Sequence, residues 1–148
     1  MKVIVLTGLV SIEKARLTTE LTDYFKDDAT VAIIDNIART AIEIEDKSLQ
    51  IERVEGDVIS ELSQVVHQIN ADVIIIAVSE QAHPEKLFVA IDDLREQQPE
   101  WDIYSLALID TRTCDCFPNV REALELYADA TVMIPYQLDG VLNYVSTA

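Results

Sequence analysis

The N-terminal segment constrains the fold of this chain more than any other stretch. Residues 2–7 form an apolar, β-branched run (KVIVLT), and Gly8 interrupts it. Leu17 and Leu21 then recur at helical spacing. This pattern predicts a strand, a glycine-led loop and a helix that begins near Glu13. A strand that passes through a short loop into a helix is a typical opening unit of an α/β fold.

The alternation of strands and helices continues along the chain. Further strands are predicted at residues 30–34, 49–54, 72–78, 103–109 and 131–134, and further helices at 58–69, 84–97, 120–127 and 140–145. Asp57 is placed to cap the helix at 58–69, and residues 37–45 suit either a helix or a loop. The strand at 72–78 (DVIIIAV) is apolar on both faces, as buried parallel strands are. We therefore expect a three-layer α/β sandwich with a mostly parallel sheet.

The length and charge of the chain limit its possible partners. With 148 residues, a single domain spanning 1–148 is expected. The formal net charge is −16, which argues against nucleic acid and anionic membrane surfaces as partners. The acidity suits a solvated surface or a docking face for a basic protein. We find no signal peptide, no run of membrane-spanning length and no disulfide framework, and therefore expect a cytoplasmic protein.

The loop after the first strand follows a phosphate-binding pattern in part. Residues 8–15 (GLVSIEKA) align with GxxxxGK[ST], and Gly8 and Lys14 are retained. Glu13 replaces the second glycine, and Ala15 lacks the hydroxyl that would hold Mg²⁺. A carboxylate about 4 Å from a phosphate charge costs roughly 4 kcal/mol at an effective dielectric near 20. We interpret Gly8 and Lys14 as a vestigial phosphate loop and expect no nucleotide cofactor.

Several segments in the same order resemble the CobW-type GTPases of metal-centre assembly, relatives of HypB and UreG. VLTGLVSIEKARLTTEL resembles the family's VLTGFLGAGKTTLLNHL, and VAIIDNIARTAIEIED resembles VAVIENEFGEIGID. DVIIIAVSEQAHPEKL resembles the strand that carries ExSGLAxP. The matching positions are Gly8, Lys14, Asn36, Gly56, Ser79, Pro84 and Asp110. The resemblance runs from residue 2 to about 139 and implies a P-loop NTPase-like fold.

The positions that carry chemistry in that family hold other residues here. The family's catalytic-strand Glu falls at Ala77, and the Gly after its Ser falls at Glu80. The metal-carrying thiolates fall on Asp57, Ile59 and Ser60, and the guanine-reading Asn-Lys-x-Asp falls on Pro135, Tyr136, Gln137 and Leu138, with Asp139 one residue late. The resemblance therefore implies a pseudo-GTPase with no catalytic residues, which is not an enzyme.

The resemblance also bears on partners. The family's further strand and helix, and the C-terminal domain that follows them, have no counterpart after Asp139, so we expect an exposed sheet edge. We therefore expect a homo-oligomer or a protein partner, and a role as a protein-binding, regulatory or assembly accessory factor. The alternative is a divergent nucleotide-binding GTPase or a metallochaperone of the same family.

Two groups of residues keep alternative interpretations. Lys14 either holds an anion or forms a salt bridge with Glu13 or with a carboxylate at a neighbouring strand end. Cys114 and Cys116 are weak candidates for a soft-metal site, with His83 as a possible third ligand, and are otherwise ordinary loop thiols. We expect no metal site.

The remaining candidates have structural interpretations that we favour. His67 lies beside the apolar stripe of its helix, and Trp101 is expected at the rim of the core. Ser79 lacks both the Gly-x-Ser-x-Gly pattern and a His–acid pair of a nucleophile. The strand-end acids Asp35, Asp110 and Asp139 suit either a cation or local caps, and we favour the caps.

Overall fold

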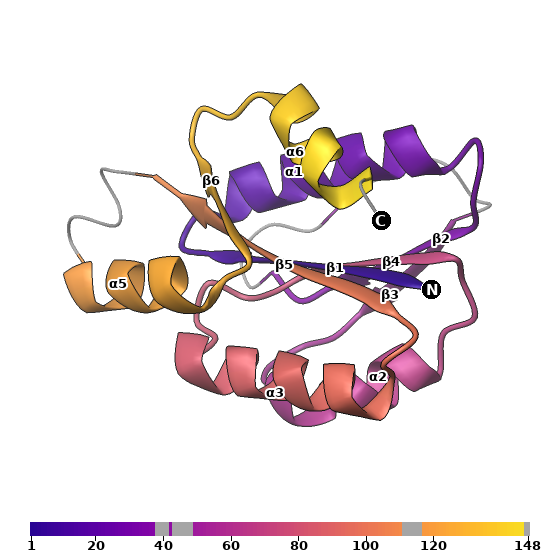
Figure 1. The fold of residues 1–148 in the computed structure, drawn as a ribbon, viewed down its shortest axis with the longest axis horizontal. Coiled ribbons are helices and arrows are strands. Elements are labelled where there is room, and N and C mark those ends of the chain that lie inside the picture. The colour runs from indigo at the N-terminus through magenta and orange to yellow at the C-terminus, as the bar shows by residue number, and fades with distance from the viewer. Residues whose placement is uncertain (38–41, 43–48, 111–116, 147–148) are drawn as a thin grey trace.

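The chain folds into a six-stranded sheet that is parallel throughout, with helices on both faces (Figure 1). The computed structural model describes residues 1–37, 42, 49–110 and 117–146. The strand order is β3-β2-β4-β1-β5-β6. The predicted three-layer α/β sandwich is confirmed, and the sheet is entirely rather than mostly parallel.

The elements follow the sequence periodicity closely. The strands are β1 (Lys2–Gly8), β2 (Val31–Asp35), β3 (Gln50–Arg53), β4 (Val73–Ala77), β5 (Asp102–Ile109) and β6 (Ala130–Met133). The helices are α1 (Ser11–Phe25), the 3₁₀ turn η1 (Ile59–Glu61), α2 (Leu62–His67), α3 (Pro84–Gln97), α5 (Pro118–Tyr127) and α6 (Leu138–Ser146).

The centre of the sheet is apolar on both faces because β1 and β4 are covered on both sides. Val3 and Val5 of β1 join the cluster beneath η1, α2, α3 and α5. Ile4 and Leu6 point to the opposite face and pack against α1 and α6. The period of two along β1 therefore divides its side chains between the two halves of the core.

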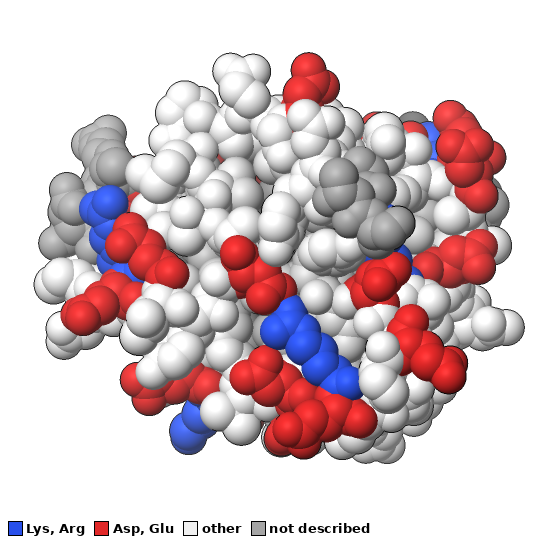
Figure 2. Space-filling model, viewed as in Figure 1, with Lys and Arg blue, Asp and Glu red and all other residues white. Residues whose placement is uncertain are grey.

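The two edge strands are much more exposed than the centre. All four residues of β3 are exposed, and Val132 is the buried residue of β6. Among the charged side chains on the face shown in Figure 2, acidic ones predominate, in line with the net charge of −16.

Three details differ from the sequence-based expectation. Helix α1 begins at Ser11 rather than near Glu13, so the preceding loop is shorter. The helix expected over 58–69 is a 3₁₀ turn followed by the short α2, and the Asp57 carboxylate accepts the amide of Ile59 at its start (3.0 Å). The helical spacing of Val120, Leu124 and Tyr127 predicts that Tyr127 faces inward, but Tyr127 ends α5 and is 49% exposed. Most of residues 37–45 lie outside the described part of the chain.

Candidate functional site

The loop between β1 and α1 is the place where the sequence predicts a vestigial phosphate site. Leu9 and Val10 alone separate Gly8 from the start of α1. Gly8 has φ +129°, and a Cβ atom there would lie 2.3 Å from the carbonyl oxygen of Leu108 in β5. Glycine is therefore required at this position by the close approach of a neighbouring strand, whatever the loop binds.

Lys14 is fully buried and turned into the protein. Its Nζ donates hydrogen bonds to the carbonyl oxygens of Gly8 (2.7 Å) and Val78 (2.6 Å). A carboxylate oxygen of Glu80 lies 4.0 Å from Nζ. Lys14 thus ties the carboxyl end of β1 to the residue that follows β4. Of its two alternatives, the salt bridge to a strand-end carboxylate is the one that the structure contains, and the partner is Glu80 rather than Glu13.

The backbone around Lys14 belongs to the helix. Lys14 is the fourth residue of α1, and its amide donates to the carbonyl oxygen of Val10 (3.3 Å). In a phosphate-binding loop, unengaged amides around the lysine point at the ligand. Here the unengaged first-turn amides precede Lys14, and α1 has no side-chain cap at Val10. Residues 11–15 of the motif therefore lie in the first turn of α1, and Leu9 and Val10 are its loop residues.

The electrostatics of Lys14 follow from its burial. Desolvation lowers the pKa of Lys14 from 10.5 to about 8, and the charge of Glu80 opposes part of that shift. The neutral amine retains donors for both carbonyl groups, so deprotonation preserves the link between β1 and Val78. A Lys14 side chain that reached outward to a phosphate would leave these two carbonyl oxygens without their donor.

The space beside this loop is small. A cavity of about 10 Å³ lies between Gly8, Ser79, Glu80 and the helices α3 and α5. A single water molecule needs about this much space, so a phosphate group could enter only if the surrounding side chains moved. The Ser79 hydroxyl accepts the amide of Gln81 (3.1 Å) and so shapes the turn after β4. Ser79 thus has a local structural contact, and the expectation that it is not a nucleophile stays a prediction.

Asp35, at the end of β2, is engaged by the backbone around it. Its carboxylate accepts the amides of Ile37 (3.1 Å) and Ile42 (2.9 Å) and the guanidinium of Arg53 (2.8 Å). The prediction that this strand-end acid acts as a cap is confirmed. Sequence reasoning missed Arg53, which also donates to the carbonyl oxygen of Ile37 (2.9 Å).

Asn36 connects three strand ends with one side chain. Its Nδ2 donates to the carbonyl oxygens of Val54 (2.8 Å) and Gly56 (3.0 Å), and its Oδ1 accepts the amide of Ser79 (2.9 Å). The matched position from the sequence comparison therefore has a structural reason to be Asn, because only an amide side chain offers both donors and an acceptor here.

The other candidates lie apart from Lys14. Trp101 is half-buried at the rim of the core, as expected, and stacks at 5.4 Å on the exposed ring of His67. His83 precedes the first turn of α3, and Asp139 is exposed in the first turn of α6.

No metal centre is evident in the part of the chain that the structure describes. Within residues 1–37, 42, 49–110 and 117–146, no three His, Cys, Asp or Glu side chains gather in a way that could hold a metal ion. Asp110 is half-buried after β5. Cys114 and Cys116 lie outside the described residues, so their assignment as weak metal candidates stays a prediction.

Comparison with solved structures identifies the architecture. The signal recognition particle receptor FtsY from Elizabethkingia anophelis in complex with GDP aligns with 94% of this chain (TM-score 0.62, 18% identity). The Zn(II)-bound YjiA GTPase from E. coli aligns with 99% (TM-score 0.58, 14% identity). This chain has the P-loop NTPase fold. It covers 50% and 54% of those two chains, about half their length.

Two further solved structures align with nearly the whole chain. FlhF complexed with GMPPNP and Mg²⁺ aligns with 99% of this chain and is 62% covered by it (TM-score 0.52, 16% identity). A de novo designed protein with the P-loop NTPase fold aligns with 98%, is 89% covered and shares 8% identity (TM-score 0.55). No protein-family model and no curated protein matches the sequence. At these identities the likeness establishes the fold alone.

The length and apolar character of a helix decide whether it can span a membrane. Among the helices of the described residues, none combines the length and apolar character needed to cross a bilayer.

Proposed function

We propose that this chain is a P-loop domain that does not hydrolyse nucleotide and acts through protein binding, as a regulatory or assembly accessory factor. The observation that carries the proposal is the internal use of Lys14, whose Nζ is bonded to Gly8 and Val78. A nucleotide phosphate would have to displace these contacts and enter a space of about 10 Å³.

The charges around the loop also support the proposal. Glu80 lies 4.0 Å from the Lys14 nitrogen, and Glu13 stands in the first turn of α1. A phosphate brought to Lys14 would meet both carboxylates, and each close pair of like charges costs several kcal/mol in a partly buried setting. Ala15 offers no oxygen to Mg²⁺.

The finer family assignment belongs to the same proposal. We propose that the chain is a degenerate relative of the CobW-type GTPases and works in the cytoplasm beside a metal-centre assembly system. The support is the ordered series of segment matches from residue 2 to about 139, together with the altered positions Glu13, Ala15 and Ala77.

Calorimetric titration with GTP, GDP and ATP, each with Mg²⁺, tests the proposal. We expect no binding heat and no thermal shift for any nucleotide. A dissociation constant tighter than about 100 μM, roughly −5.5 kcal/mol, would overturn it. GTP turnover above that of a Lys14→Ala control would do the same. The double variant Glu13→Gly/Ala15→Thr restores the motif and tests whether these two residues account for the loss.

The second candidate is a divergent nucleotide-binding GTPase. It is favoured by the fold shared with FtsY in complex with GDP and with FlhF in complex with GMPPNP and Mg²⁺, and by the retained Gly8 and Lys14. In this case Lys14 would leave its carbonyl partners when nucleotide enters. Nucleotide binding that is lost in Lys14→Met and kept in Lys86→Met would establish it.

A metallochaperone role is a variant of the second candidate. YjiA is described as Zn(II)-bound, and Cys114 and Cys116 are the thiols that this chain offers. Equilibrium dialysis with Zn²⁺ tests it, because a Cys114→Ser/Cys116→Ser variant that retains all bound metal would exclude these thiols.

A further inference from the structure

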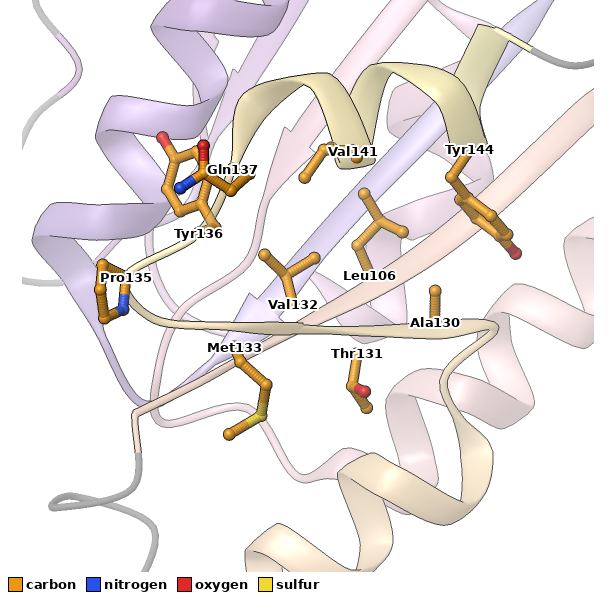
Figure 3. A pocket seen from close by; sticks show the side chains of 11 residues that line it. Leu106, Ala130, Thr131, Val132, Met133, Pro135, Tyr136, Gln137, Val141 and Tyr144 are labelled. Carbon is orange, nitrogen blue, oxygen red and sulfur yellow. The ribbon is translucent and has the colours of Figure 1, made fainter.

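The outer edge of β6 borders an apolar groove. Between β6 and α6 lies a cavity of about 400 Å³ (Figure 3). Leu106, Val132, Tyr136, Val141 and Tyr144 contribute most of its apolar wall, and no charged side chain lines it. Within the described residues, β6 pairs with β5 on one side and with no strand on the other. The groove and the strand edge therefore form one continuous surface, which we call the β6 edge.

The hydrogen-bonding groups of the β6 edge can be assigned from its register. The amide of Ile134 donates to the carbonyl oxygen of Ile109, so Ile134 faces β5 (2.9 Å). Backbone groups alternate in direction along a parallel strand. The N–H and C=O groups of Thr131 and Met133 therefore point away from β5, where an added strand would meet them.

Side chains on both faces of β6 are placed to contact such a strand. Val132 points into the groove toward α6, whereas Thr131 and Met133 point to the opposite face (Figure 3). Met133 is 45% exposed. A strand added here would bury alternate side chains against the groove on one face and against Met133 on the other. An occupant with apolar residues on both faces fits this edge.

The rim of the groove is acidic. The Tyr136 hydroxyl donates to a carboxylate oxygen of Glu20 (2.7 Å). Burial raises the pKa of Tyr136, and the negative charge of Glu13 also raises it. Asp139 lies in the first turn of α6, next to Gly140 of the groove wall, and Arg16 offsets part of this charge. In Figure 2 the region over β6 and α6 is largely uncharged, and acidic side chains lie along parts of its margin. An uncharged centre with an acidic rim complements an apolar segment with basic ends.

We propose that the β6 edge binds an extended segment of a partner protein, apolar in its middle and flanked by Lys or Arg, by adding it to the sheet as a seventh strand. A second copy of this chain fits less well, because each copy carries a net charge of −16. This inference names the partner class of the proposed protein-binding role and rests on that role. Its test uses no nucleotide, so either proposal can fail alone.

The binding test uses two labelled synthetic peptides. One is Lys-Lys-Val-Leu-Val-Leu-Val-Lys-Lys, which is apolar on both faces of a strand, and the other has Glu in place of every Lys. Fluorescence anisotropy at low salt is expected to show binding of the basic peptide and at least about tenfold weaker binding of the acidic one. Amide hydrogen exchange of the complex is expected to slow at Thr131 and Met133, whose N–H groups face outward.

Two pairs of variants locate the peptide on the β6 edge. Thr131→Pro removes one outward N–H and no bond to β5, and should weaken binding by about tenfold or more, whereas Thr131→Val keeps the N–H and the affinity. A Cβ atom at Gly140 meets nothing within 4 Å, so a side chain introduced at that site begins in open space. Gly140→Trp should block the groove, and Gly140→Ala should not.

Three outcomes would overturn the inference. The first is failure of the basic peptide to bind at about 1 mM, a level weaker than −4.1 kcal/mol. The second is equal affinity of the native protein, Thr131→Pro and Gly140→Trp for that peptide, which would place binding elsewhere. The third is a native dimer, measured by analytical ultracentrifugation, that Thr131→Pro converts to a monomer, because a second copy would then be the occupant.

Discussion

A single side chain, Lys14, decides how the loop after β1 is interpreted. The residue matches the phosphate-binding pattern in sequence, yet in the fold its ammonium group serves two backbone carbonyls and faces Glu80. Buried carbonyl groups need donors, and removal of the donor exposes their full desolvation cost. Lys14 therefore links the carboxyl end of β1 to Val78, the residue that follows β4.

Replacement of Lys14 by an apolar side chain of similar length should destabilise the fold. Lys14→Met leaves the carbonyl oxygens of Gly8 and Val78 without this donor and takes the nearby cation from Glu80. We expect the free energy of unfolding to fall by about 2–4 kcal/mol, measured by urea denaturation. The double variant Lys14→Met/Glu80→Gln should recover part of the loss. An unchanged urea midpoint in Lys14→Met would contradict the claim that the Lys14 hydrogen bonds stabilise the fold.

The titration of Lys14 gives a pH dependence of stability with a defined sign. Its folded-state pKa is about 8 and its ordinary value is 10.5, so between these pH values the unfolded chain binds more protons. The free energy of unfolding should therefore rise with pH in this window, by at most about 1.4 kcal/mol per pH unit, and stay at its lower level below pH 8. Urea denaturation from about pH 7 to pH 10 measures the slope.

The Lys14→Met variant, and the opposite sign of the tyrosine titrations, separate the contribution of Lys14 from that of other titrating groups. Lys14→Met should lack the rise between about pH 8 and pH 10. Burial raises the pKa values of Tyr104, Tyr136 and Tyr144, so these phenols act with the opposite sign and only at higher pH, near their ordinary value of 10. A slope that is identical in the native protein and in Lys14→Met would contradict the assignment.

At the scale of elements, the carboxyl ends of the strands are held together by a few polar side chains. Asn36 joins the ends of β2, β3 and β4, and Lys14 joins β1 to the segment after β4. Gly8 allows β1 to pass close to the backbone of β5. The edge where parallel α/β sheets commonly bind ligands is therefore rich in internal contacts in this chain.

The two glycines with positive φ separate conformational strain from steric overlap. Gly56 has φ +79° and open space around an added Cβ, whereas an added Cβ at Gly8 meets the Leu108 carbonyl at 2.3 Å. Gly56→Ala should lower the free energy of unfolding by about 1 kcal/mol from strain alone. Gly8→Ala should cost several times more, because strand β1 or β5 must shift. Thermal unfolding of both variants tests the order, and equal losses would refute it.

At the scale of the whole molecule, charge is distributed unevenly over a regular fold. The chain holds 27 acidic and 11 basic residues, and acidic side chains outweigh basic ones on the face shown in Figure 2. Self-repulsion of such a surface weakens the compact state and is screened by salt. The β6 edge differs from this acidic surface, because no charged side chain lines its groove.

Added salt should therefore stabilise the protein. Raising NaCl from about 0.01 M to about 0.5 M shortens the screening length from about 30 Å to a few ångströms, and we expect the thermal midpoint to rise by several degrees. Sodium sulfate stabilises proteins through exclusion as well, so NaCl is the appropriate salt. A midpoint that falls with NaCl would show that attractive ion pairs, such as Arg53–Asp35, outweigh the repulsion.

The sequence by itself determined the fold class and most of the element boundaries. The strand at 72–78 and the helix at 84–97 could be predicted because the spacing of apolar residues indicates which side chains are buried. The expected cap at Asp35 also followed from its place at a strand end. The start of α1 at Ser11 did not, because helix boundaries respond to packing and to loop length more than to propensity.

Tertiary structure alone decided what the loop residues do. The partners of Lys14, Asn36 and Gly8 are Val78, Ser79 and Leu108, each far away in the chain and brought close by the pairing of β1, β2, β4 and β5. A sequence motif shows the type and spacing of its residues. It does not show whether a carbonyl group from another strand will form hydrogen bonds with their side chains. That competition depends on burial, where an unsatisfied backbone oxygen costs more than a lost ligand contact.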